Sequence, residues 1–235
     1  PYRDIAITLG MGWLAFMVIS DAIISPSGTG NIYMNATPRV IYGWAKAGTF
    51  FKAFTHIDKA SGIPRPALWL TFGLSIFWTL PFPSWEQLIS VVSAALVLSY
   101  AIAPVTAAGL RRNAPDLPRP FRVRAFGIIG PISFMISALI VYWSGWNTLS
   151  WLLGLQIVMF VVYVMCKGKV PEHTVSLAQQ VKSSLWLIVF YALIILFSWL
   201  GSFGGLNVIG HPWDTVLVAA MSLGIYYWGA RSCLP

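Results

Sequence analysis

Long apolar runs separated by short polar connections dominate this chain. Seven runs have about the length that a helix needs to cross the bilayer, roughly 20 residues for about 30 Å of hydrocarbon. They show no period-2 alternation, so the pattern predicts membrane-spanning α-helices and not a β-barrel. The seven predicted spans are Ile5–Ile24, Ala67–Phe82, Leu88–Leu110, Phe126–Trp143, Leu149–Cys166, Leu185–Leu200 and Thr215–Ala230.

Composition supports an all-α integral membrane protein. Hydrophobic residues make up 57% of the chain and charged residues 9%, and the mean hydropathy is +0.74. Soluble domains carry about 25% charged residues, because a water-facing surface needs them. A chain with so few charges cannot cover its outside with polar groups, so most of that outside must face lipid.

The basic residues occupy every second connection between the predicted spans. Of 15 Lys and Arg residues, only Arg3 lies outside the connections after the first, third, fifth and seventh spans. The positive-inside rule then predicts an N-terminus outside and a C-terminus in the cytoplasm. We expect the plasma (inner) membrane as the location. The net charge of +8 is therefore interpreted as a topology signal and as anchors for lipid phosphates, not as a nucleic-acid site.

The first span contains a polar, helix-breaking stretch. Asp21 lies in an apolar run, and Pro26, Gly28 and Gly30 follow it. Pro removes a backbone donor and Gly weakens a helix. We therefore expect one long helix, from about Asp4 to Ala47, that is kinked or opened at residues 25–30. Discontinuous helices of this kind form the substrate and ion sites of many secondary transporters.

This stretch supplies most of the candidate site residues. An ionisable residue in a membrane helix is a functional candidate by default, and desolvation favours a neutral carboxyl, so Asp21 is a candidate proton carrier. The alternative is that Asp21 lies near the interface or pairs with another helix. The neighbouring small residues either line a pathway or form a packing kink. These pathway candidates are Ser25, Ser27, Gly28, Thr29 and Asn31.

Catalytic and metal-binding patterns are not visible in the sequence. Cys166 and Cys233 are far apart, and the three histidines are equally scattered. A metal site would need such ligands clustered at short spacing. We expect no cofactor, no metal and no enzymatic activity.

Two stretches resemble the amino acid–polyamine–organocation (APC) superfamily of permeases. Residues 36–64, which begin ATPRVIY, are similar to the end of the family's eighth helix and the segment after it, with Phe51 where Pro is common. Residues 110–123, LRRNAPDLPRPFRV, resemble the linker after the tenth helix, with Arg124 where Pro is commoner. Residues 20–30 are similar to the acidic-amino-acid–proton symporters of this family.

The resemblance implies a part of the LeuT-like fold of two inverted repeats. Residues 1–166 would be helices eight to twelve, and residues 167–235 two additional C-terminal helices. Helix eight borders the substrate or ion site in relatives, which favours the residues after Asp21. Helix ten adds Ser93 and Tyr100 as weaker candidates, although the apolar context alone makes Ser93 a packing residue.

The resemblance implies the carboxy-terminal half of a proton-coupled amino-acid transporter that works by alternating access. Its expected partners are an amino acid, a proton, membrane lipids and the N-terminal helices of a longer transporter, since the chain begins at Pro1 without Met. The alternative is a truncated, non-transporting membrane fragment or scaffold subunit.

Overall fold

The computed structural model describes residues 2–80, 84–165 and 177–233, and every regular element in them is a helix. The chain divides into two compact units, and each is described by itself. The first contains residues 2–80 and the second contains residues 84–165 and 177–233. The helices of the first unit are α1 (Tyr2–Thr8), α2 (Gly12–Lys46), the 3₁₀ turn η1 (Lys52–Thr55) and α3 (Arg65–Thr79).

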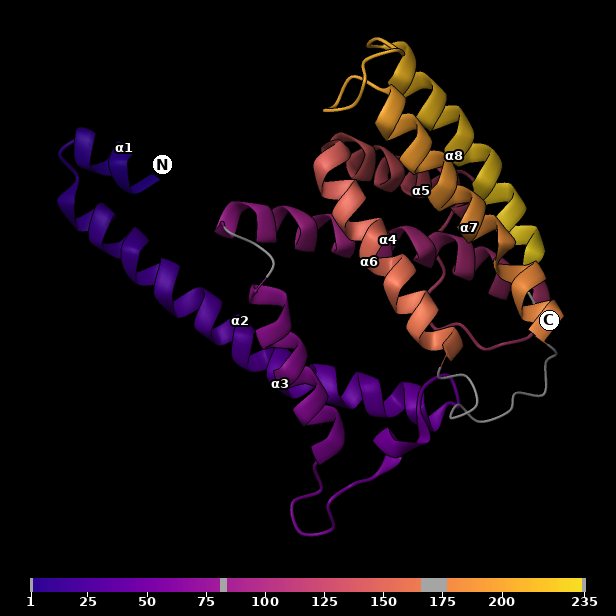
Figure 1. Ribbon diagram of the computed structural model, residues 1–235, viewed down its shortest axis with the longest axis horizontal. Helices are drawn as coiled ribbons and strands as arrows, with labels where there is room; N and C mark the ends of the chain where they lie inside the picture. Colours follow the sequence, from indigo (N-terminus) through magenta and orange to yellow (C-terminus); the bar gives the residue numbers. More distant parts are fainter. Residues whose placement is uncertain (1, 81–83, 166–176, 234–235) are drawn as a thin grey trace. The chain divides into compact units, whose positions relative to one another are not determined.

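A short turn near the N-terminus separates α1 from α2 (Figure 1). Gly10 has a φ of +70°, which a residue without Cβ adopts at little cost. The amide of Met11 donates to Ala6 O at 2.8 Å and that of Gly10 donates to Ile7 O at 2.9 Å. This pair of bonds is a Schellman motif, which satisfies the last carbonyls of α1 and ends it. The first predicted span, Ile5–Ile24, is therefore interrupted at Gly10.

Helix α2 runs without interruption through residues 25–30, so the predicted opening at that stretch is wrong. Pro26 lies inside the helix and supplies no amide for the carbonyl of Ala22. The hydroxyl of Ser27 donates to Ile23 O at 2.6 Å, the next carbonyl along the helix. Neither Gly28 nor Gly30 has a positive φ. The stretch therefore loses one backbone hydrogen bond at Pro26 and stays helical.

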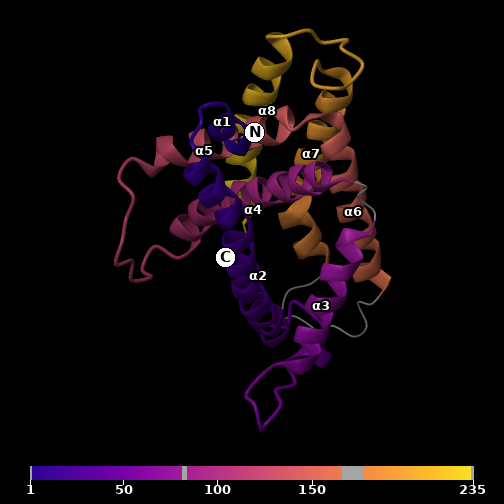
Figure 2. The same cartoon turned by 90° about the vertical axis from the view of Figure 1, so that its left-hand side faces the viewer.

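The C-terminal part of α2 carries most of the packing of the first unit. Pro38, Ile41 and Ala45 are buried there, and both α3 and η1 pack against α2 (Figure 2). At the N-terminal end only Ala15 of α2 is buried. Every residue from 21 to 33 is exposed. The middle of this long helix therefore lacks a packing partner among the described residues of the first unit.

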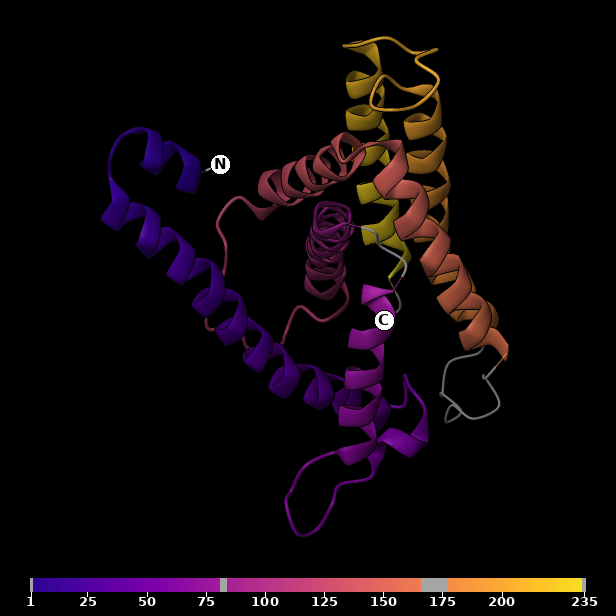
Figure 3. The same ribbon diagram turned by 60° about the vertical axis from the view of Figure 1, so that its left-hand side comes forward.

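The second unit is a helical bundle. Its helices are α4 (Trp85–Asn113), α5 (Phe126–Trp143), α6 (Gly145–Met165), α7 (Leu177–Leu200) and α8 (Trp213–Ser232). Helix α5 packs against α4 and α8, and α7 lies beside α8 (Figure 3). Residues three, four and seven apart on α4 are buried, as an amphipathic packing face requires. They are Val91, Ala94, Leu98, Ala101 and Val105.

Phe134 of α5 forms the centre of this bundle. It is 1% exposed, and its ring centroid lies 5.1 Å from that of Phe190 and 6.1 Å from that of Tyr226. Trp186 adds an edge contact at 6.4 Å. These rings come from α5, α7 and α8, so the last two helices share a core with α5.

Four helices of the described residues are long and apolar enough to cross a membrane. They are Trp85–Asn113, Phe126–Trp143, Gly145–Val162 and Val181–Leu200. These ranges overlap four of the seven predicted spans. The described helices at the other three predicted spans, Ile5–Ile24, Ala67–Phe82 and Thr215–Ala230, do not meet the same criteria. The chain is thus a helical membrane protein, and the count of seven spans and the orientation of the termini stay predictions.

Candidate functional site

The predicted pathway residues on α2 lie along an exposed stretch. Asp21, Ser25 and Gly28 are spaced at i, i+4 and i+7 of one continuous helix, so they share a face, and all three are exposed. Thr29 and Asn31 are exposed too. The side-chain amide of Asn35 donates hydrogen bonds to the backbone carbonyl and the side-chain oxygen of Asn31, at 2.9 and 3.3 Å. The helix thus carries polar groups on a surface that the first unit leaves uncovered.

Ser93 and Tyr100 lie on α4, in the second unit. They are seven residues apart on one helix and both are exposed, Tyr100 by 67%. They therefore lie along the side of α4 that faces away from its buried residues. The structure brings the α2 candidates together along one helix and these two together along another.

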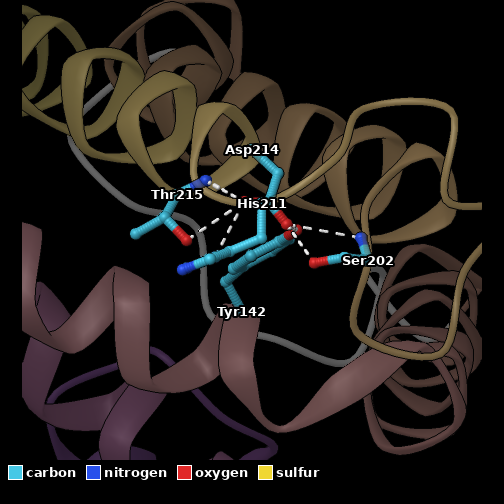
Figure 4. Close-up of polar contacts among 5 residues, drawn as sticks. All are labelled: Tyr142, Ser202, His211, Asp214 and Thr215. Atoms are coloured by element: carbon cyan, nitrogen blue, oxygen red, sulfur yellow. Dashed lines mark hydrogen bonds and ion pairs between the residues drawn. The ribbon is translucent and has the colours of Figure 1, made fainter.

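A cluster of hydrogen-bonded polar side chains surrounds Asp214 at the beginning of α8 (Figure 4). Asp214 is 0% exposed. The hydroxyl of Tyr142, on α5, donates to its Oδ2 at 2.7 Å. Ser202, just after α7, donates to the same oxygen through its hydroxyl and through its amide, the latter at 3.3 Å. One carboxylate therefore joins α5, the α7–α8 connection and α8.

The second oxygen of Asp214 is satisfied from its own helix and from the connection. Oδ1 accepts bonds from the amide and hydroxyl of Thr215, at 2.6 and 3.2 Å. His211 Nδ1 lies 3.6 Å away, and its side chain is 64% exposed. An acidic side chain at this position also interacts favourably with the amides of the first helical turn.

The ionised form of Asp214 is strongly favoured. Burial disfavours the charge, but the hydrogen bonds from Ser202 and Tyr142 outweigh it and hold the pKa of Asp214 below its ordinary value of 3.8. A carboxylate with this many donors is a fixed structural anion. The cluster is therefore suited to holding helices together and not to exchanging protons near neutral pH.

Glycines allow the cluster to pack closely. A Cβ on Gly201 would overlap the hydroxyl of Tyr142 and lie 2.7 Å from Phe197 O. The ring of Phe203 packs edge-on against that of Tyr142, at 5.5 Å between centroids. The amide of Trp146 donates to Phe203 O at 3.0 Å, which also ties the start of α6 to this connection.

Sequence analysis did not identify this cluster. Tyr142 lies within an apolar run, Ser202 in a connection and Asp214 at the edge of another run, so each has an ordinary local explanation. Their one local signal is an acid at the beginning of a predicted helix, typical of a helix N-terminus. Nothing in the spacing relates Tyr142 to a carboxylate 72 residues later.

No group of three or more His, Cys, Asp or Glu residues that could hold a metal ion occurs in the part of the chain that the structure describes. His173 and Cys166, which the sequence analysis considered, lie outside the described residues.

A profile of the amino acid permease family matches residues 6–164. The chain belongs to this family. The match covers more than half of the chain and includes α2, α4 and α5, which carry both groups of predicted site residues and Tyr142. The permease family that the motifs indicated is thus confirmed.

Curated relatives match this permease chain along its length. It is 57% identical over 236 residues to an aspartate-proton symporter of Bacillus subtilis (strain 168), covering 100% of this chain and 45% of the relative. It is 33% identical over 234 residues to the glutamate/serine transporter AimA of the same organism, covering 99% and 43%. The branched-chain amino acid permease BcaP is 19% identical over 169 residues, covering 72% and 36%.

The chain spans less than half the length of each of these relatives. No solved structure matches it significantly. The relatives therefore define the family, and the helical arrangement comes from the structure described above.

Proposed function

We propose that this chain is the carboxy-terminal part of an amino acid–proton symporter in the plasma membrane. The observation that carries the proposal is the 57% identity to an aspartate-proton symporter over the whole chain. A second relative, at 33% identity, is named for glutamate and serine. Both names include an acidic amino acid, which supports an acidic substrate. The relatives are named as transporters, which supports transport over enzymatic activity.

The lengths of the relatives support a larger transporter. The matched region is 45% of the aspartate-proton symporter and 43% of the glutamate/serine transporter. We infer that further helices precede this chain and complete the substrate site. The exposed stretch of α2 from residue 21 to 33 is then the surface that those helices cover. The N-terminus of this chain would lie outside and its C-terminus in the cytoplasm, since the basic residues alternate between connections.

Asp21 is the proton carrier in this proposal. A carboxylate at membrane depth is costly unless it lines a hydrated cavity or pairs with another group. Proton uptake neutralises the carboxylate. The neutral carboxyl costs less to bury when the transporter closes around its substrate. Ser25, Ser27, Gly28, Thr29 and Asn31 follow Asp21 on the same helix and line the pathway. Ser93 and Tyr100 on α4 are weaker members of the same lining.

Asp21→Asn in the full-length permease tests the proposal. A carboxamide keeps the shape but carries no proton, so aspartate uptake driven by a pH gradient should fall at least about tenfold. Exchange of labelled for unlabelled aspartate, which needs no net proton movement, should persist. Glu86→Gln, at an exposed position in the first turn of α4, is the matched control and should transport normally. Unchanged uptake with unchanged pH dependence would remove Asp21 from the proposal.

The second candidate is a non-transporting membrane fragment or scaffold subunit. The observation that favours it is that the chain spans less than half of each relative. Reconstitution of this chain alone into vesicles separates the two. Aspartate uptake by vesicles that contain this chain alone would exclude a non-transporting fragment or scaffold subunit. Uptake that requires the preceding helices would support the symporter.

A further inference from the structure

The connection between α4 and α5 emerges at a membrane surface. Both helices are long and apolar enough to span a bilayer. Helix α4 ends at Asn113 and α5 begins at Phe126, so residues 114–125 lie at the level where both helices leave the hydrocarbon. This holds whichever side of the membrane they face. The connection therefore meets lipid headgroups.

Two arginines give this connection a fixed shape. The guanidinium of Arg119 donates to four carbonyls, those of Leu110, Ala114, Pro115 and Leu117, at 2.6 to 3.3 Å. Leu110 O belongs to the last turn of α4 and the other three carbonyls to the connection, so one side chain ties the connection to the helix end, where its positive charge offsets the negative end of the helix dipole. Arg111 lies over the ring of Phe126 at 4.1 Å. The connection is thus tied to both of its helices.

The other three arginines face outward. Arg112, Arg122 and Arg124 are exposed, and within the described ranges none of them has a hydrogen bond or ion pair. Asp116 is the one acidic residue between positions 111 and 124 in the sequence. The connection therefore has a net positive charge, and its backbone is held in place by the contacts of Arg119 and Arg111.

Exposed apolar side chains accompany these charges. Phe121 is 81% exposed and Leu117 is 51% exposed. Phe121 directly precedes Arg122. An aromatic ring beside cations is typical of segments that lie in the headgroup region, where the ring enters the acyl boundary and the cations contact phosphates.

We propose that residues 112–124 form a binding site for anionic phospholipid, with Arg122 and Arg124 contacting the headgroup and Phe121 inserted beside it. Zwitterionic lipids offer the same apolar boundary but no net charge, so the guanidinium groups select the anionic lipid. Each Lys or Arg near an anionic membrane surface contributes about 1 kcal/mol, roughly a fivefold preference. Selection therefore depends on Arg122 and Arg124, and insertion depends on Phe121.

Titration of the purified full-length permease in detergent with phosphatidylglycerol or phosphatidylcholine, followed by native mass spectrometry, tests the site. The wild type should bind phosphatidylglycerol more tightly than phosphatidylcholine. Arg122→Gln/Arg124→Gln should weaken binding of phosphatidylglycerol at least about fivefold and leave phosphatidylcholine unchanged. Lys52→Gln/Lys59→Gln removes the same charge from another exposed segment and should keep the preference. Phe121→Ser should weaken binding of both lipids alike.

The proposal is wrong if the double Arg variant keeps the wild-type affinity for phosphatidylglycerol. It is also wrong if inorganic phosphate, at matched ionic strength, displaces the lipid, because that result indicates a site for free anions. If another segment of the protein covers these arginines, the double variant will lose thermal stability without losing lipid, which also overturns the proposal. All of the substituted side chains are exposed, so the variants should fold.

Discussion

The hydroxyl of Tyr142 donates a 2.7 Å hydrogen bond to the buried carboxylate of Asp214, 72 residues later in the chain. Because Tyr142 is on α5 and Asp214 begins α8, the bond ties two helices together at one end of their contact. Ser202 donates to the same oxygen from the intervening connection. A buried anion with donors from three segments resists any movement that would separate one of them, since an unpaired buried charge is costly.

Tyr142→Phe should destabilise the protein by about 1–3 kcal/mol, because it removes one donor from a buried carboxylate without changing the packing of the ring. Thermal unfolding of the purified protein in detergent measures the loss. Tyr227→Phe is the matched control, since Tyr227 is 51% exposed and should change the midpoint little. Equal midpoints for the two variants would show that the Tyr142 bond does not stabilise the fold.

Acid should destabilise the same cluster. The pKa of Asp214 is lower in the folded protein than its ordinary value of 3.8, so the unfolded chain takes up a proton first. The stabilisation is complete above pH 3.8 and is lost as the pH falls below it toward the folded pKa, with a limiting slope of about 1.4 kcal/mol per pH unit.

Unfolding midpoints between pH 7 and pH 3 test this dependence. Asp214→Asn removes the titrating group, so its stability should be lower at pH 7 and should change less in acid. If the variant and the wild type lose stability in parallel below pH 4, other carboxyl groups are responsible.

Gly201→Ala should destabilise the α7–α8 connection by about 1–3 kcal/mol, because an overpacked side chain forces its neighbours to move. The added methyl group would overlap the Tyr142 hydroxyl and lie too close to Phe197 O. Gly224→Ala is the control, since nothing lies within 4 Å of its added Cβ, and an alanine inside a helix should stabilise by about 0.5–1 kcal/mol. The unfolding midpoint should fall in Gly201→Ala and rise in Gly224→Ala. A Gly201→Ala variant as stable as the wild type would contradict the close approach of Tyr142 to Gly201.

Arg119→Gln should loosen the end of α4. The variant loses charge-assisted bonds to four carbonyls, and we expect a cost of about 1.5–3 kcal/mol. Hydrogen exchange should accelerate at residues 110–117 and remain slow in the middle of α4. Arg39→Gln removes the same charge from an exposed side chain of α2 and should leave exchange at residues 110–117 unchanged. Similar exchange in the two variants would mean that Arg119 does not hold this end.

The sequence predicted the helical class well, because a long apolar run can satisfy its backbone in a membrane by forming a helix. The predicted spans Leu88–Leu110 and Phe126–Trp143 lie within or match α4 and α5. Their hydropathy alone determines that they are helices. The permease family also followed from local motifs at residues 36–64 and 110–123.

The position of the first helix break was not predictable from composition. Residues 25–30 contain Pro26 and two glycines, yet Gly10 ends a helix and that stretch does not. The two stretches differ in the Schellman bonds that form at Gly10, and the glycines at positions 10 and 12 give no local sign of those bonds. The Asp214 cluster was missed because its members come from distant segments, and side-chain contacts of that kind depend on tertiary packing.

The aromatic centre at Phe134 has a consequence for shortened relatives. Phe134 contacts Trp186, Phe190 and Tyr226, all of which follow residue 166. A permease that ended near residue 166 would turn this face of α5 toward lipid. The apolar ring of Phe134 could face lipid acyl chains without cost, but the hydroxyl of Tyr142 would lose its acceptor, Asp214. Such proteins should therefore carry an apolar residue at the position of Tyr142.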